Sequence, residues 1–292
     1  MISLAELNAS SPDEFVAAIG DVFENAPWIA ARVAQQRPFE TVAALHDAMM
    51  RVIAGATLAE ILSFLRGHPE LAGKVARAGA MTDHSVAEQG SLGLDRLSDD
   101  AFSRFETLNS AYRARFGFPF IICVRRHTRD SILARFAERL RNDMETEQGA
   151  AIGEIGFISR LRLTAKVTGP GMPITTGRLS THVLDTTRGR PAPGVKLSLH
   201  EIGADGSAEI VSTCTNQDGR TKEPLIADQP LRIGTYELRF HVGAYFAAMA
   251  NGASEPPFLD MVPIRFSIAE PEAHYHVPLL VSPGSYTTYR GS

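Results

Sequence analysis

The stretch TGPGMPITTG, residues 168–177, divides this chain of 292 residues into two halves with different sequence patterns. It consists mainly of glycine, proline and threonine, a composition typical of turns and linkers. Before it, apolar residues recur three and four positions apart, the period of an α-helix. After it, apolar and polar residues alternate, the period of a β-strand. The sequence therefore predicts an all-α domain over residues 1–167, a linker over 168–176 and an all-β domain over 177–292.

The first half contains several segments that begin at a residue suited to cap a helix. Ser11 precedes Pro12, and proline is favoured at the first helical position because the N–H it lacks has no helical partner there. Thr41 and Thr57 precede two further periodic segments, the second of which reaches Gly67. We expect helices over residues 11–25, 41–53, 57–67, 98–117, 129–143 and 149–163.

The second half contains short alternating segments separated by turn signals. The turn signals include RGRPAPG at 188–194 and TNQDGRT at 215–221. Residues 243–251, GAYFAAMAN, form the only good helical pattern of this half. The sequence predicts an antiparallel β-sandwich with one short helix. Strands are expected over residues 178–186, 194–202, 208–215, 235–242, 262–268, 274–282 and 285–291.

The composition is that of a globular protein, with 44% hydrophobic residues, 21% charged residues and a net charge of −4. This balance gives no electrostatic reason to expect nucleic acid or an anionic membrane as a partner. Cys123 and Cys214 are far apart and fit a reduced compartment better than a disulfide scaffold. The first residues lack the basic and apolar pattern of a signal peptide, and no apolar run is long enough to cross a bilayer. We expect a cytoplasmic protein.

The β half carries polar residues that a plain sandwich does not need. His182 lies within an alternating segment, and Arg220 follows an Asp-Gly turn. His274 and His276 are two positions apart and therefore point to the same face of a strand. Each histidine could instead be a half-exposed surface residue, and His-x-His with His182 could hold zinc, although a catalytic zinc needs three ligands and an open position.

These segments together resemble the 5-hydroxyisourate hydrolase family, the transthyretin-related enzymes of urate breakdown. The matching motifs are LSTHVLDTTRGRPA at 179–192, TNQDGR at 215–220 and HYHVPLLVSPGSYTTYRGS at 274–292. The resemblance implies a catalytic set of His182, Arg220, His276 and Ser292, with Tyr289, Arg290 and Gly291 at the substrate. It implies no metal and no cofactor.

The residue types suit the hydrolysis of a cyclic amide. One histidine takes a proton from water, while the second orients the water or returns a proton to the leaving nitrogen. Arg220 steadies the developing oxyanion. We favour His276 as the base with His182 assisting, although the sequence leaves this choice open. The alternative is a transthyretin-like binding module, which would need an apolar channel rather than these polar residues.

The α half holds candidate residues that have structural explanations when taken singly. His68 lies between Gly67, which ends a helix, and Pro69, which we expect to open the next. Ser85 and Glu88 have the spacing of a capping box, which would make Glu88 purely structural. Arg160 could be a surface ion-pair residue.

As a set, these stretches resemble the decarboxylase of 2-oxo-4-hydroxy-4-carboxy-5-ureidoimidazoline (OHCU). The motifs are NAPWIA at 25–30, GHPEL at 67–71, SVAEQGSLGL at 85–94, FGFPFIIC at 116–123 and ISRLRL at 158–163. The resemblance implies that His68 is the catalytic acid and that Glu88 orients the ring or repels the departing carboxylate. It implies substrate contacts from Pro69, Ser85, Gln89, Phe120, Ile121, Ile122, Cys123, Val124 and Arg160. No cofactor motif is present, and none is needed for this reaction.

The two resemblances name consecutive steps, because the hydrolase family makes OHCU and the decarboxylase family converts it to (S)-allantoin. The sequence therefore predicts a bifunctional enzyme of urate catabolism whose partners are small-molecule substrates. By family likeness we expect a homo-oligomer, a tetramer built around the β domains. The alternative is that one domain is inactive and serves as an assembly scaffold. Channelling of OHCU between the sites stays open.

Overall fold

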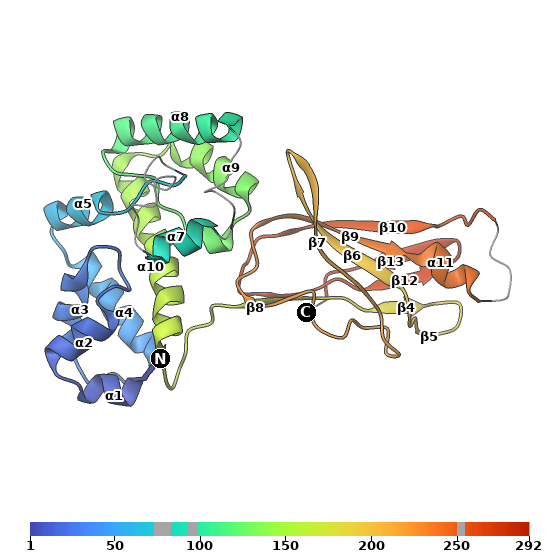
Figure 1. The fold of residues 1–292 in the computed structure, drawn as a ribbon, viewed down its shortest axis with the longest axis horizontal. Helices are drawn as coiled ribbons and strands as arrows, with labels where there is room; N and C mark the ends of the chain where they lie inside the picture. The colour runs from blue at the N-terminus through green and yellow to red at the C-terminus, as the bar shows by residue number, and fades with distance from the viewer. Residues whose placement is uncertain (73–82, 91, 93–98, 250–254, 292) are drawn as a thin grey trace. The chain divides into compact units, whose positions relative to one another are not determined.

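The computed structural model describes residues 1–72, 83–90, 92, 99–249 and 255–291 (Figure 1). The chain forms two compact units, which we call the helical domain and the β domain. The helical domain comprises Met1–Arg125 and Ile132–Thr175, and the β domain comprises Arg126–Ser131 and Thr176–Ser292. The change from one unit to the other thus falls within the glycine-proline stretch, and the short segment Arg126–Ser131 is grouped with the β domain.

The helical domain is built from helices over most of its length, as the apolar periodicity predicts (Figure 1). A short parallel pairing of β1 (Ile2–Ser3) with β2 (Val167–Thr168) joins its two ends. The helices are α1 (Leu4–Ala9), α2 (Pro12–Ile19), α3 (Pro27–Ala34), α4 (Val42–Ala54), α5 (Leu58–Arg66), α7 (Asp83–Gly90), α8 (Asp99–Phe116), α9 (Arg129–Arg139) and α10 (Met144–Lys166), with a 3-10 turn over Val124–Arg126.

Three predicted helix starts are confirmed, but α10 begins at Met144 rather than at residue 149, because Asp143 caps it, and α2 ends at Ile19 rather than at residue 25. Ser11 caps α2 with Pro12 at its first position, and Thr41 caps α4 by accepting a hydrogen bond from the N–H of Ala44. Thr57 caps α5 as part of a capping box, and Gly67 follows the last residue of that helix. Pro69 does not open a helix within the described residues, since residues 69–72 form a loop and a turn.

A buried polar cluster fixes the loop that follows α8. Glu147 on α10 is completely buried and accepts hydrogen bonds from Arg139 and Tyr112. Arg139 also donates through Nη1 to the carbonyl of Ile121 at 2.7 Å and lies over the ring of Phe120 at 4.5 Å. Because a buried charge is stable only when it is paired and hydrogen-bonded, this cluster holds the residues around Ile121 in one conformation.

Within its described residues, the β domain contains three sheets and the short helix α11 (Val242–Ala247), and its core is apolar. The first sheet has the order β10-β9-β6-β7, the second β13-β12-β4-β5 and the third β11-β3-β8. Their strands are β3 (Gly177–Ser180), β4 (Val183–Asp185), β5 (Arg190–Pro191), β6 (Lys196–Gly203), β7 (Gly206–Cys214), β8 (Ile226–Gln229), β9 (Gly234–His241), β10 (Met261–Ile268), β11 (His274–His276), β12 (Leu279–Ser282) and β13 (Ser285–Thr288).

The sandwich differs in two ways from the predicted one. β3 pairs with β11 and β4 pairs with β12 in parallel, so the sheets are mixed rather than wholly antiparallel. The expected strands over 178–186 and 274–282 are each interrupted, at residues 181–182 and 277–278. The expected strand 178–186 passes from one sheet to another near His182. Side chains at this break therefore do not follow the regular alternation between the two faces of a strand.

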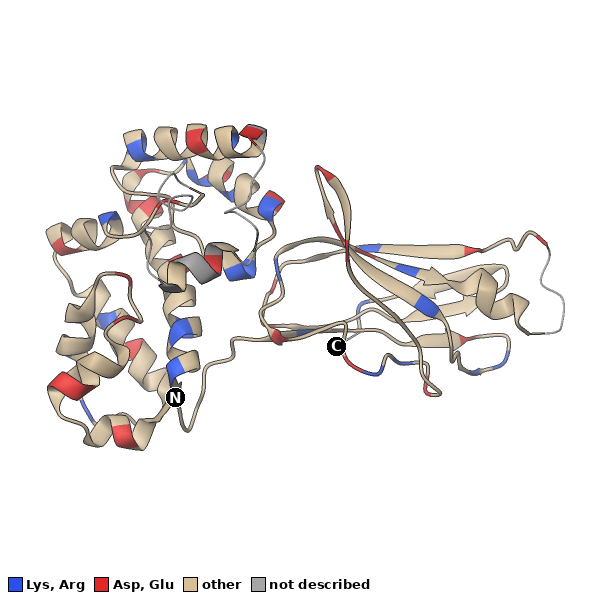
Figure 2. Cartoon of the chain, viewed as in Figure 1, with Lys and Arg blue, Asp and Glu red and all other residues tan. Residues whose placement is uncertain are grey.

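Charged residues of both signs lie on both domains (Figure 2), consistent with the small net charge. Within the described residues, no single helix has the length and hydropathy of a membrane span. Only α4 and α5, taken together as a pair bent by 113°, meet that test by length and composition.

Candidate functional site

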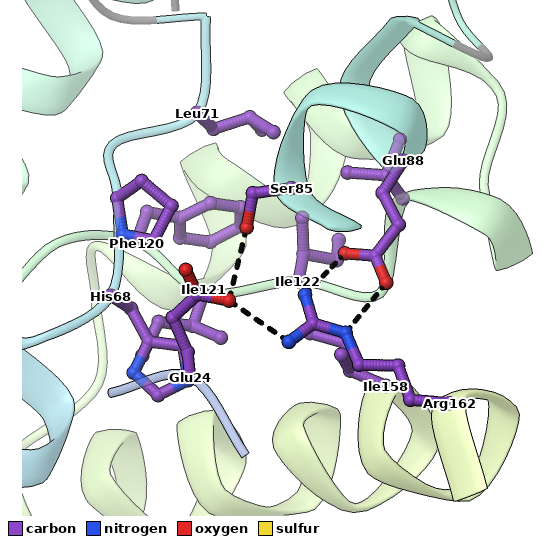
Figure 3. Close-up of a pocket in the computed structure, with 12 residues that line it drawn as sticks. Glu24, His68, Leu71, Ser85, Glu88, Phe120, Ile121, Ile122, Ile158 and Arg162 are labelled. Atoms are coloured by element: carbon purple, nitrogen blue, oxygen red, sulfur yellow. Dashed lines mark hydrogen bonds and ion pairs between the residues drawn. The ribbon is translucent and has the colours of Figure 1, made fainter. Parts of the chain in front are cut away.

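The helical domain encloses a pocket where segments distant in sequence meet (Figure 3). The polar side chains in its lining come from the loop after α2, the end of α5, α7 and α10. The apolar side is formed mainly by the loop that Arg139 holds in place. The lining residues are Glu24, His68, Pro69, Leu71, Ser85, Glu88, Phe120, Ile121, Ile122, Val124, Ile158 and Arg162.

His68 enters this pocket just after the end of α5. Its Nδ1 lies 3.1 Å from the carbonyl oxygen of Phe64, so Nδ1–H donates there and the lone pair of the neutral ring remains on Nε2. Asn25 donates through Nδ2 to the carbonyl of Gly67 at 2.8 Å and holds this turn from the other side. Burial lowers the pKa of His68 to about 4, so the resting imidazole is neutral at pH 7.

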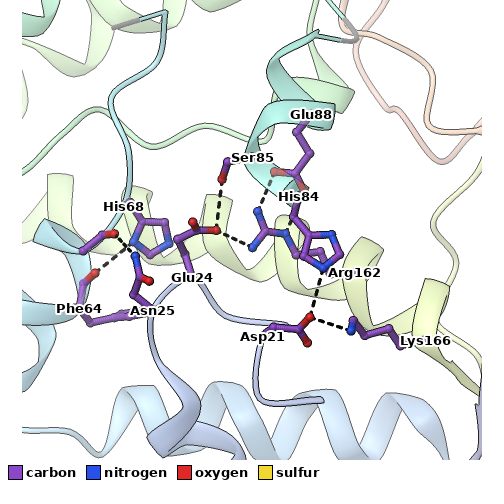
Figure 4. A network of polar contacts seen from close by, with 11 residues as sticks. Asp21, Glu24, Asn25, Phe64, His68, His84, Ser85, Glu88, Arg162 and Lys166 are labelled. Carbon is purple, nitrogen blue, oxygen red and sulfur yellow. Dashed lines mark hydrogen bonds and ion pairs between the residues drawn. The ribbon is translucent and has the colours of Figure 1, made fainter. Parts of the chain in front are cut away.

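Arg162 is the cationic centre of the pocket (Figures 3 and 4). It donates through Nε and Nη2 to the two carboxylate oxygens of Glu88, at 2.9 and 2.8 Å. It donates through Nη1 to Oε2 of Glu24 at 2.9 Å. These bonds use three of the five guanidinium N–H groups. Two carboxylates therefore share one buried guanidinium, a fork geometry that suits arginine and not lysine.

Arg160, the arginine that the OHCU-decarboxylase resemblance implies, does not line this pocket. Its guanidinium lies over the ring of Phe157, 5.6 Å from the centroid. Residues two apart on an α-helix point about 200° apart, so Arg160 and Arg162 of α10 face different surroundings. Ile158 and Arg162 are four apart and share the face that lines the pocket.

The other expected residues of this half are placed as follows. Pro69, Ser85, Glu88, Phe120, Ile121, Ile122 and Val124 line the pocket. Cys123 is buried but does not line it, and its N–H donates to Oε2 of Glu154 at 2.8 Å. Gln89 lies on α7, but its side chain is outside the described part of the structure.

Ser85 and Glu88 do not form a capping box. α7 begins at Asp83, so Ser85 is inside the helix rather than at its N-cap. Its hydroxyl donates to Oε2 of Glu24 at 3.2 Å, while the carboxylate of Glu88 pairs with Arg162. The capping interpretation of Glu88 is therefore wrong, because both side chains are directed to the pocket.

A second polar group lies beside the pocket (Figure 4). Asp21 accepts from Nζ of Lys166 at 2.7 Å and lies 3.3 Å from Nε2 of His84. It ties the end of α10 and the start of α7 to the loop that carries Glu24. The side chains of this group are partly exposed. They support the position of the buried group formed by Arg162 and its two carboxylate partners.

In the β domain, His182 lies between β3 and β4 and pairs through its backbone with Arg220. Its ring makes a hydrogen bond with the backbone of Asp218, and its Nε2 is buried without a hydrogen-bond partner among the described residues. Gly219 has a φ of +68°, and a side chain there would meet the carbonyl of Val183 at 2.3 Å. Only glycine permits this close approach of the turn to His182.

His276 lies on β11 opposite Ser180 of β3. Its Nδ1 is 2.9 Å from Oγ of Ser180, and its carbonyl accepts the N–H of Gly291 at 2.8 Å. A Cβ at Gly291 would lie 2.8 Å from Cδ2 of His276, so the C-terminal segment runs directly against the imidazole. The parallel pairing of β11 with β3 and this contact bring the expected residues from both ends of the domain together.

The remaining expected residues are near the same edge. Arg220 and Tyr289 are exposed, and the guanidinium of Arg290 lies over the ring of Tyr275 at 4.5 Å. Ser292 lies outside the described residues. The roles that the resemblances imply for these residues, and for those of the helical domain, stay predictions.

Burial and positive charge act together on the two histidines. Burial, and then the charge of Arg220, lower the pKa of His182 below its usual value. The same two causes lower the pKa of His276, with smaller contributions from His182 and His274. Both imidazoles are therefore neutral and able to accept a proton at neutral pH. In the part of the chain that the structure describes, no three His, Cys, Asp or Glu side chains gather as a metal site would require.

Sequence reasoning missed three residues of these sites. Glu24 immediately precedes the NAPWIA stretch, and Arg162 lies four residues after Ile158 on α10. Ser180 is two residues before His182 and opposite His276. The spacing of four residues between Ile158 and Arg162 could have indicated that both face the pocket. Glu24 and Ser180 can be recognised as site residues only in the folded chain.

Comparison with known proteins yields a match for each half. Residues 8–164 match the family model described as OHCU decarboxylase, and residues 179–291 match the one described as HIUase/Transthyretin family. A 5-hydroxyisourate hydrolase of Deinococcus radiodurans is 51% identical over 114 residues, covering 39% of this chain and 95% of that protein. A 2-oxo-4-hydroxy-4-carboxy-5-ureidoimidazoline decarboxylase of Haloferax volcanii is 38% identical over 165 residues, covering 56% and 96%. The crystal structure of an (S)-allantoin synthase matches with 32% identity and a TM-score of 0.54, covering 100% of both chains.

Proposed function

The chain belongs to the OHCU decarboxylase family through its helical domain and to the HIUase/transthyretin family through its β domain, and from this premise we propose that it converts 5-hydroxyisourate to (S)-allantoin. The β domain hydrolyses 5-hydroxyisourate to OHCU, and the helical domain decarboxylates OHCU. The observation that carries the joint assignment is the match to an (S)-allantoin synthase over the full length of both chains.

In the hydrolase site, His276 takes a proton from the attacking water through Nε2. His182 offers its Nε2 lone pair to orient that water or an N–H of the substrate, because its ring is already fixed by the backbone of Asp218. Arg220 stabilises the charge that develops on the ring carbonyl oxygen. The protonated histidine returns its proton to the leaving ring nitrogen, and the six-membered ring opens.

In the decarboxylase site, the carbon that loses CO₂ is next to a carbon–nitrogen double bond, which accepts the electron pair. Arg162 has two N–H groups beyond those bound by Glu24 and Glu88, and these bind substrate oxygens. Glu24 and Glu88 carry two negative charges against the one positive charge of Arg162. The remaining negative charge destabilises the substrate carboxylate more than the neutral CO₂ that it becomes.

His68 supplies the proton that replaces the lost carboxylate. The resting ring is neutral, since its pKa is about 4, so it must first take up a proton at Nε2. An anionic substrate favours this protonated form. Delivery from one nitrogen to one face of the ring carbon fixes the chirality of the product.

Beyond the reactions, we propose a homotetramer assembled through the β domains in the cytoplasm. Family likeness supports the assembly, and the two separate thiols support a reducing compartment. Light scattering of the purified full chain measures the assembly directly, and a monomer would contradict it. Fluorescence microscopy of a tagged chain in its own host tests the location.

A coupled assay tests the two reactions. 5-Hydroxyisourate is generated from urate with urate oxidase, and ultraviolet absorbance is followed together with circular dichroism. Rapid loss of hydroxyisourate and prompt appearance of (S)-allantoin are expected. Decay of hydroxyisourate at the rate seen in buffer would contradict the hydrolase assignment and favour a binding role for the β domain. Normal decay with accumulation of OHCU would mean that the helical domain is an inactive scaffold.

A further inference from the structure

Ser180 connects two histidines with one hydroxyl group. Its Oγ lies 2.9 Å from Nδ1 of His276 and 2.9 Å from Nε2 of His274. The two rings come from the same strand, β11, and their centroids are 6.3 Å apart. His274 is exposed, whereas His276 is partly buried against the C-terminal segment. The three side chains thus form a line from solvent to the hydrolase site.

A hydroxyl group has one proton to donate and two lone pairs with which to accept, so it can donate to at most one of the two rings. In one arrangement Nδ1–H of His276 donates to Ser180, whose O–H donates to Nε2 of His274. The lone pair of His276 then stands on Nε2. In the reverse arrangement His274 donates to Ser180, which donates to Nδ1 of His276. The proton of His276 then lies on Nε2, so Nε2 has no lone pair and cannot act as the base.

The base step distinguishes these arrangements. When His276 takes a proton from water, both ring nitrogens carry hydrogen, and Nδ1–H must donate. Arrangements in which His276 donates to Ser180 accommodate this cation without rearrangement, whereas the reverse arrangement does not. A site in which His276 already donates to Ser180 at rest avoids reorganisation during the reaction.

We propose that Ser180 and His274 are positioning residues that hold His276 with its proton on Nδ1 and its Nε2 free to act as the base. The proposal rests on the proposed hydrolase function of the β domain. His274 accepts the hydrogen bond that the Ser180 hydroxyl donates. The Ser180 oxygen then accepts the hydrogen bond from Nδ1–H of His276. The bond between Gly291 N–H and the His276 carbonyl fixes the backbone so that the ring stays in reach of Ser180.

Substitutions at exposed His274 test the direction of this line. His274→Gln keeps an acceptor for the Ser180 hydroxyl, whereas His274→Lys offers only donors. His274→Gln is expected to keep kcat within about threefold of the native value, a smaller change than the loss of one hydrogen bond would cause. His274→Lys and Ser180→Ala should each lower kcat about tenfold, the equivalent of one neutral hydrogen bond, with KM changed much less. The control is His241→Lys, which adds the same charge at another exposed histidine, at the end of β9.

Long-range ¹H–¹⁵N NMR of the histidine rings provides a second readout that needs no activity. Native protein and His274→Gln should show His276 protonated on Nδ1, and His274→Lys should shift the population toward Nε2–H. Equal losses of kcat in His274→Gln and His274→Lys, with an unchanged His276 tautomer, would overturn the proposal. If native protein does not accelerate hydroxyisourate decay, the hydrolase assignment fails, while the NMR tautomer still decides whether this line sets the state of His276.

Discussion

Arg162 on α10 and Glu88 on α7 are joined by two parallel hydrogen bonds of 2.9 and 2.8 Å, although they are 74 residues apart in sequence. This pair closes one side of the pocket in the helical domain and leaves guanidinium N–H groups for a substrate. It also explains why Glu88 has no capping role, because its two carboxylate oxygens accept hydrogen bonds from Arg162.

The first prediction concerns the two arginines of α10. Arg162→Lys should lower kcat/KM of OHCU decarboxylation about a hundredfold, because lysine cannot hold both carboxylate oxygens and a substrate together. Arg160→Lys should have a small effect, since that side chain lies over Phe157 outside the pocket. Steady-state kinetics with enzymatically generated OHCU measures both variants. The opposite ranking would restore Arg160 as the substrate-binding arginine.

The second prediction separates the two reactions. His68→Gln should slow OHCU decarboxylation by about 10²- to 10⁴-fold, the usual contribution of a positioned proton donor. OHCU should then accumulate and decay without catalysis, so that the allantoin formed loses its excess of the S form. Circular dichroism measures this chirality, while absorbance should show hydroxyisourate loss at the native rate. A stereospecific product from this variant would exclude His68 as the proton donor.

The third prediction follows from the charge of Arg220. The base of the hydrolase must be neutral, so activity falls at acid pH as the histidines become protonated. Burial and Arg220 lower the pKa of His182 and of His276, which places the acid limb of kcat/KM below 6.5, the ordinary value. Arg220→Gln should reduce the rate and also move this limb upward. A pH profile of unchanged shape would show that Arg220 does not act on the base.

The fourth prediction concerns Gly291. Gly291→Ala should reduce hydrolase kcat about tenfold or more, because the added Cβ would lie 2.8 Å from Cδ2 of His276 and displace either the ring or the terminal segment. Decarboxylation of OHCU by the same variant should be unchanged. Gly284→Ala is the matched control, since nothing lies within 4 Å of a Cβ at that position. Equal activity of the two variants would contradict the contact.

The fifth prediction concerns the stability of the helical domain in acid. Burial lowers the pKa of His46 to about 4, from 6.5 in an unfolded chain. The unfolded state therefore binds a proton first as the pH falls, and stability is lost between about pH 6.5 and pH 4, by up to about 3 kcal/mol for one histidine.

Replacing His46 should weaken this dependence. His46→Gln should flatten the decline in the melting temperature of the helical domain between about pH 7 and pH 5. His241→Gln, at an exposed site, should leave the decline unchanged. Thermal unfolding followed by circular dichroism at 222 nm gives both slopes. An identical slope for native protein and His46→Gln would show that this histidine is not the source.

The sequence by itself determined the architecture of each half. The change of period at residues 168–177, the caps at Ser11, Thr41 and Thr57, and the alternation beyond Gly177 depend on neighbouring residues along the chain. Local steric and hydrogen-bonding preferences act over a few positions, so a linear pattern expresses them. The motifs around His68, Glu88, His182 and His276 also identified the families, because their order is a property of the chain.

Only the tertiary structure decided which side chains meet. It placed Arg162, rather than Arg160, in the pocket, brought Glu24 onto the same guanidinium, and set Ser180 between His274 and His276. It also made two strand pairings parallel, which carries His276 to the edge that holds His182. These contacts join residues far apart along the chain, and their geometry is set by burial and by the pairing of buried charges, which no local pattern encodes.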